Sequence, residues 1–159
     1  MSSQIETTDR PAPIRENWDK FDDIERLIKS TCPAVECPVH HLFTPGLYSR
    51  EFHAPAGSVV TSKIHKTEHQ YIVSSGYAKV WIDGVGGQEN RAPYRGITMP
   101  GTRRVLIVLE DLIWTTFHPT NLVDVDEIER EIIEERHEHL DGITQPVLDE
   151  QAEKALKGE

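Results

Sequence analysis

The chain has 159 residues, of which 37% are hydrophobic and 28% are charged, and its formal net charge is −10. This acidic balance argues against a nucleic-acid-binding protein, which needs a basic patch to neutralise phosphates. No run of about 18 apolar residues is present, so no transmembrane span is predicted. The first residues lack the basic and apolar regions of a signal peptide, so a reducing, cytoplasmic setting is expected.

The N-terminal part is predicted to be an arm followed by a helix. Residues 1–16 are polar and contain two prolines, which is typical of a flexible arm. Between 17 and 30, apolar residues recur at helical spacing and predict an amphipathic helix. We expect its apolar face to pack on the main domain or on a neighbouring subunit. That face consists of Trp18, Phe21, Ile24, Leu27 and Ile28.

The chain has only two cysteines, Cys32 and Cys37, and each precedes a proline. His40 and His41 follow closely and could complete a zinc site. The spacing is not a usual one for zinc, however. We therefore favour the interpretation that these are two thiols in a loop stiffened by proline.

Residues 38–121 are predicted to form one β domain. Short β-branched and aromatic runs alternate with turns rich in glycine and proline, which favours an antiparallel sandwich or barrel. The expected strands cover residues 39–43, 47–53, 58–64, 70–74, 77–83, 96–99, 105–109 and 113–118.

Residues 122–159 are predicted to be a helical extension. Apolar residues at helical spacing between Asp124 and Leu140, with glutamates between them, indicate an acidic amphipathic helix that Gly142 ends. The remaining residues, 143–159, are polar and contain the pattern of a weak last helix.

Three histidines are the candidate metal ligands. His65 and His69 lie between two predicted strands, and His118 closes the last one. Side chains alternate along strands, so Lys63 would share a face with His65, and Tyr71 with His69. Three imidazoles suit iron, zinc, nickel or copper better than magnesium or calcium.

The stretch from Gly57 to Gly76 resembles the first motif of the cupin superfamily. That motif reads Gly, five residues, His-x-His, three or four residues, Glu, six residues, Gly. The spacing fits here, but Lys63 takes the place of the first histidine and His69 that of the glutamate. The resemblance implies a cupin-type antiparallel jelly-roll barrel with an N-terminal helix and a C-terminal acidic helix. It also implies a ligand cavity inside the barrel.

The second cupin motif is altered. Gly96, Pro100 and Gly101 match it with shortened spacing, Arg104 takes the histidine position, and the asparagine is absent. Either His118 replaces the missing ligand or the site no longer holds a metal. Residues 63–69, 100–104 and 110–119 also look like small single cupins of tailed bacteriophages and prophages.

The first functional hypothesis is a metal-dependent enzyme that acts on a small anionic or oxygen-bearing substrate. Arginine is a good clamp for carboxylate or phosphate. Arg103 and Arg104 could equally well form ion pairs with Glu110 and Asp111. The candidate residues are His65, His69 and His118 for the metal, Lys63, Arg103 and Arg104 for the substrate, and Glu68 and Tyr71 for acid–base catalysis.

The second hypothesis is a non-catalytic structural or interaction module, such as a cement, decoration or tail protein of a phage virion. A ligand sensor is a weaker third hypothesis, because the chain has no DNA-reading pattern. The predicted helices at 17–29 and 124–140 carry two apolar stripes. We therefore expect a homo-oligomer, dimeric or higher, with at least one of these helices in the interface.

Overall fold

The computed structural model describes residues 18–134, 143 and 144. The predicted N-terminal arm and the predicted last helix lie outside these residues. The elements are, in chain order, α1 (Trp18–Thr31), β1 (Ala34–Val35), β2 (Val39–Thr44), β3 (Leu47–Ala54), β4 (Val59–Thr61), β5 (His69–Ile82), β6 (Gly86–Arg91), β7 (Tyr94–Thr98), β8 (Arg104–Pro119), α2 (Val125–Ile132) and β9 (Ile143–Thr144).

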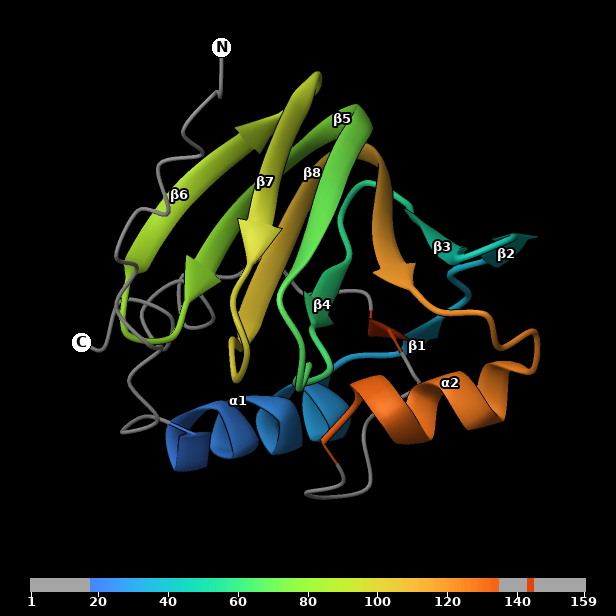
Figure 1. Cartoon of the computed structure of the whole chain (residues 1–159). Coiled ribbons are helices and arrows are strands. Elements are labelled where there is room, and N and C mark those ends of the chain that lie inside the picture. The colour runs from blue at the N-terminus through green and yellow to red at the C-terminus, as the bar shows by residue number, and fades with distance from the viewer. Residues whose placement is uncertain (1–17, 135–142, 145–159) are drawn as a thin grey trace, which may run out of the picture.

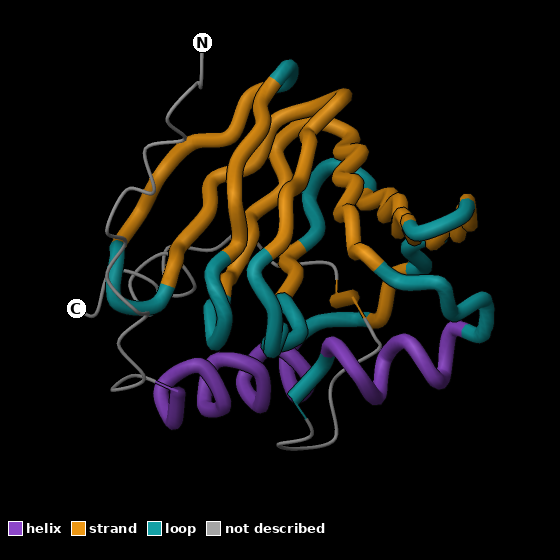
Figure 2. Tube along the Cα trace, viewed as in Figure 1, coloured by secondary structure: helices purple, strands orange, loops and turns teal. Residues whose placement is uncertain are grey.

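The strands form a curved antiparallel sheet, and both helices lie along one end of it (Figures 1 and 2). β8 is the central strand and pairs with β3, β4 and β5, while β5 also pairs with β6 and β7. The prediction of a mainly β, jelly-roll fold of the cupin type with a helix towards each end is confirmed. Within the described part of the chain, neither helix is long and apolar enough to cross a membrane.

The two longest strands each join two predicted ones. Residues 70–74 and 77–83 were expected as separate strands, but both belong to β5, and β8 likewise includes 105–109 and 113–118. Gly76 does not form a turn; with a φ of 88° it lies in a bulged stretch of β5 where the register against β8 shifts. A Cβ at this position would lie 2.1 Å from the carbonyl oxygen of Asp111. The glycine is needed because the two bent strands approach each other so closely.

β6 was not predicted, because its sequence is polar and rich in glycine. It pairs with the second half of β5 across the turn at residues 83–85. Only Asn90 within it is buried. A segment without alternating apolar residues carries no period-2 signal in its sequence. Only its pairing with a neighbouring strand identifies it as a strand.

α2 ends earlier than predicted. The sequence pattern indicated a helix to Leu140, but α2 ends at Ile132, and Ile133 is extended with φ −106° and ψ 135°. The N–H of Lys66 donates to the carbonyl of Ile132 at 2.7 Å, and the N–H of Glu134 donates to that of Ile64 at 2.9 Å. Strand-like pairing with residues 64–66 therefore replaces the next helical turn.

Both helices bury their apolar faces on their own barrel. Phe21 and Ile24 of α1 belong to a buried cluster that also contains strand residues. Ile128 and Ile132 of α2 pack with Tyr48 of β3. The apolar side chains on which we based the expected homo-oligomer are therefore, for these residues, buried within the chain itself. The homo-oligomer stays a prediction, and these side chains no longer support it. The buried strand residues of the α1 cluster are Val59, Val105 and Ile107.

Candidate metal centre

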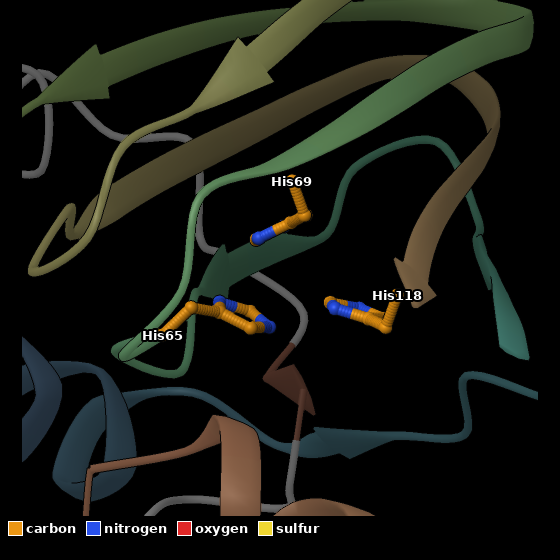
Figure 3. A group of neighbouring side chains, drawn as sticks. All are labelled: His65, His69 and His118. Carbon is orange, nitrogen blue, oxygen red and sulfur yellow. The ribbon is translucent and has the colours of Figure 1, made fainter. Parts of the chain in front are cut away.

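Three histidines from distant parts of the chain converge at one end of the barrel. His65 follows β4, His69 begins β5, and His118 is the penultimate residue of β8. One ring nitrogen of each lies within 4.8 Å of the others. The ring centroids are 4.4 Å apart for His65–His69 and 4.5 Å apart for His69–His118. Figure 3 shows the three rings facing a common space.

Strand periodicity explains the position of two of the candidate ligands. His69, Tyr71 and Val73 are buried while their neighbours in β5 are exposed, so all three face inwards, as predicted. His118 is buried at the end of β8 and lies opposite Tyr48 in the register with β3. His65 lies outside the named strands, and an isolated antiparallel bridge to Ile133 holds its backbone in position.

All three imidazoles are uncharged at neutral pH. Burial lowers the pKa of His69 to about 4 and that of His118 to about 3. Burial, followed by the proximity of the other two rings, holds the pKa of His65 well below its usual value. A neutral imidazole keeps a lone pair on one nitrogen, which is the form that binds metals.

The hydrogen bonds of the trio leave nitrogens available for a metal. Nδ1 of His69 donates to the carbonyl oxygen of Thr67 at 3.1 Å, so its Nε2 carries the lone pair. Nε2 of His118 is 3.0 Å from the hydroxyl oxygen of Thr116. Nδ1 of His118 is buried and has no hydrogen-bond partner among the described residues. A metal ion would satisfy this nitrogen, so the residues fit the metal that the cupin resemblance implies.

A cavity of about 160 Å³ adjoins the histidines. His65 and His69 line it, together with aromatic and aliphatic side chains such as Phe52, Leu106 and Trp114. Cys37 also lies on the wall, and burial raises the pKa of its thiol to about 11, so it stays protonated. The place of Cys37 on the cavity wall could not be predicted from the sequence, because a thiol in a loop carries no periodic signal.

Of the predicted substrate-binding residues, Arg104 and Lys63 line the cavity. Arg104 is only 6% exposed, and its guanidinium carbon is 5.3 Å from the ring centroid of Tyr71 and 5.9 Å from that of Trp114. Lys63 forms an ion pair with Glu129 of α2 at 2.8 Å.

Arg103 points to a different part of the molecule. It forms buried ion pairs with Asp22 at 2.6 Å and with Glu25 at 2.9 Å, both on α1. This corrects both expectations for Arg103, since it does not line the cavity and its partners are not Glu110 and Asp111. Burial next to two carboxylates of a neighbouring helix makes it a structural side chain.

The two predicted acid–base residues do not line the cavity either. Glu68 is exposed in the segment between His65 and His69. Tyr71 is buried and stacks on Trp114 with ring centroids 4.3 Å apart. Tyr71 therefore contacts two residues that line the cavity, Arg104 and Trp114, but does not line it itself.

The alternative zinc cluster is not assembled. Among the described residues, the histidine trio is the only group of three or more potential ligands close enough to share an ion. Cys32 and Cys37 are both free thiols.

The comparisons with known proteins yield solved structures only. No protein-family model and no curated protein matches the chain. The cupin domain of Cnp3 from Schizosaccharomyces pombe is 16% identical, with 64% of this chain and 70% of that one covered and a TM-score of 0.45. KdgF from Halomonas sp. is 18% identical, with 60% and 89% covered and a TM-score of 0.47. An RmlC-like cupin from Methanocaldococcus jannaschii is 8% identical, with 54% and 82% covered and a TM-score of 0.45.

The described residues form an antiparallel β protein with a candidate metal centre of three histidines at one end of the sheet. The antiparallel β fold that the Gly57–Gly76 motif implied is confirmed by the strand pairing of the described residues. The narrower likeness to cupins of phages and prophages, and with it the alternative role in a virion, stays a prediction.

Proposed function

We propose that this chain is a metal-dependent cupin in which His65, His69 and His118 hold a divalent transition metal. The observation that carries the proposal is the convergence of three uncharged imidazoles, one with a buried nitrogen that has no partner among the described residues. An all-nitrogen donor set favours iron, zinc, nickel or copper.

We extend the proposal to an enzyme that acts on a small anionic or oxygen-bearing substrate. Held by these three histidines, the metal would supply Lewis-acid polarisation of a substrate oxygen. Arg104 and Lys63 line the adjoining cavity and would bind and orient an anionic group. The apolar wall around Leu106 and Trp114 lowers the local dielectric constant, which strengthens these charged contacts. Glu68 is exposed and is not part of this proposal.

Metal analysis of tag-free protein tests the metal centre. After reconstitution we expect roughly one equivalent of a transition metal per chain, and His69→Ala and His118→Ala should each lose most of it, because removing one of three ligands leaves the set incomplete. His40→Ala is the matched control, since His40 is exposed and outside the trio. Less than about a tenth of an equivalent in the unmodified protein would refute the proposal.

A further inference from the structure

The cavity wall is positively charged although the chain as a whole is strongly acidic. Among the described residues that line it, the charged ones are Arg50, Lys63, Arg104 and Glu129, which is three cations against one carboxylate. The net charge of the chain is −10. Lys63 and Glu129 pair with each other, so the two arginines provide the positive charge that the wall leaves uncompensated. Such a wall concentrates anions from solution.

Arg103 and Arg104 are adjacent in sequence and both buried, but they differ in their ion-pair partners. Arg103 is 2% exposed and has two carboxylate partners, Asp22 and Glu25. Arg104 is 6% exposed, yet no carboxylate of the described residues lies within ion-pair distance of it. Its Nε is also buried without a hydrogen-bond partner there.

An unpaired buried cation is costly unless an anion joins it. Burial lowers the pKa of Arg104, and the hydroxyl of Tyr71 opposes that shift only in part. Arginine remains charged in proteins even so. The described residues supply no carboxylate for Arg104, and an anion that enters the cavity from solution would take that place.

We propose that the cavity binds a small carboxylic acid and that the guanidinium of Arg104 holds its carboxylate. The inference rests on the proposed function, because it assigns a substrate class to the same cavity. The guanidinium lies close to the rings of Tyr71 and Trp114. Its planar fork of N–H donors matches a carboxylate. The volume of about 160 Å³ is well below that of a site for drug-sized ligands, so the acid has few atoms.

The described wall fits a carboxylate better than a phosphate. Phosphate sites commonly use the free N–H groups at a helix N-terminus. The helix at this cavity, α2, contributes Glu129 and Ile132 from its C-terminal half, and Ile133 follows directly after it. Its N-terminus is capped instead by Asp124, which accepts a hydrogen bond from the N–H of Glu127.

Calorimetric titration of the full-length, metal-free protein with glycolate tests the inference without relying on enzyme activity. We expect saturable binding of glycolate and none of glycolamide, its neutral analogue. Arg104→Gln should weaken glycolate binding about tenfold or more, because a hydrogen-bonded charge pair is lost. Arg104→Lys keeps the charge but loses the fork, so it should bind with intermediate affinity. Arg95→Gln, at an exposed position of β7, is the matched control and should bind like the unmodified protein.

Three outcomes would overturn the inference. The first is that the unmodified protein does not bind glycolate at millimolar concentration. The second is that Arg104→Gln binds glycolate with an affinity within about twofold of the unmodified protein. The third is that the unmodified protein binds inorganic phosphate more strongly than glycolate. A circular dichroism melt identifies variants that fail to fold, and Arg104→Lys then decides the result. Metal uptake is measured separately. Glycolate binding without metal uptake would refute the proposed function alone, and metal uptake without glycolate binding would refute this inference alone.

Discussion

His65 and Ile133 form an isolated antiparallel bridge, although 68 positions separate them in the numbering. The bridge ties a candidate metal ligand to the residue that follows α2. Backbone hydrogen bonds from Lys66 to Ile132 and from Glu134 to Ile64 lie on either side of it. The end of α2 therefore helps to set the position of His65, and the helix belongs to the site as much as to the exterior of the barrel.

We predict that Ile128→Ala destabilises the protein by about 2–5 kcal/mol, because it opens a cavity at a fully buried side chain. Ile128 is 0% exposed and packs in the cluster around Tyr48. Val123→Ala is the control; Val123 is 73% exposed, and its loss should change the free energy of unfolding by less than about 0.5 kcal/mol. Urea denaturation measures both. Equal effects of the two substitutions would show that α2 is not anchored as described.

The metal-free protein should lose stability as the pH falls below about 6.5. In the unfolded chain a histidine takes up a proton near its usual pKa of 6.5, whereas folded His69 does so near 4 and folded His118 near 3. Between these values the unfolded state binds more protons, so acidification favours unfolding. Urea midpoints at several pH values measure the slope. His118→Asn should flatten it, and an unchanged slope would contradict the assignment of His118 as buried and neutral.

Arg103→Met should lower the free energy of unfolding by about 3–5 kcal/mol, because it leaves two buried carboxylates without their arginine. Asp22 and Glu25 bind Arg103 at 2.6 and 2.9 Å and connect α1 to the start of β8. Arg26→Met is the control, since the pair of Arg26 with Asp23 is exposed and should contribute at most about 1 kcal/mol. Thermal or urea denaturation compares them. A small effect at Arg103 would mean that α1 is held mainly by Phe21 and Ile24.

Gly76→Ala should be far more damaging than Gly57→Ala. Both glycines have positive φ, 88° and 87°, so alanine at either position carries a backbone cost of about 1–2 kcal/mol. Only at Gly76 would the new Cβ also collide with backbone, at 2.1 Å from the carbonyl oxygen of Asp111, while nothing lies within 4 Å at Gly57. We expect Gly76→Ala to unfold at clearly lower urea concentration. Equal midpoints would indicate that β5 and β8 can move apart at the bulge.

The local sequence determined the fold class and the candidate metal ligands. Alternation along β5 placed His69 and Tyr71 on the inner face, and the spacing from Gly57 to Gly76 indicated a cupin barrel before any contact was known. Local patterns suffice here because a strand with one buried face repeats every two residues, whatever its neighbours are.

Tertiary structure decided which polar side chains line the candidate site. Arg103 and Arg104 are adjacent in sequence, but one pairs with α1 and the other lines the cavity. The end of α2 at Ile132 was likewise set by pairing with residues 64–66, against a helical pattern that continued further. An ion pair or a strand bridge depends on a partner many residues away, and the local pattern of charge or hydrophobicity does not encode that partner.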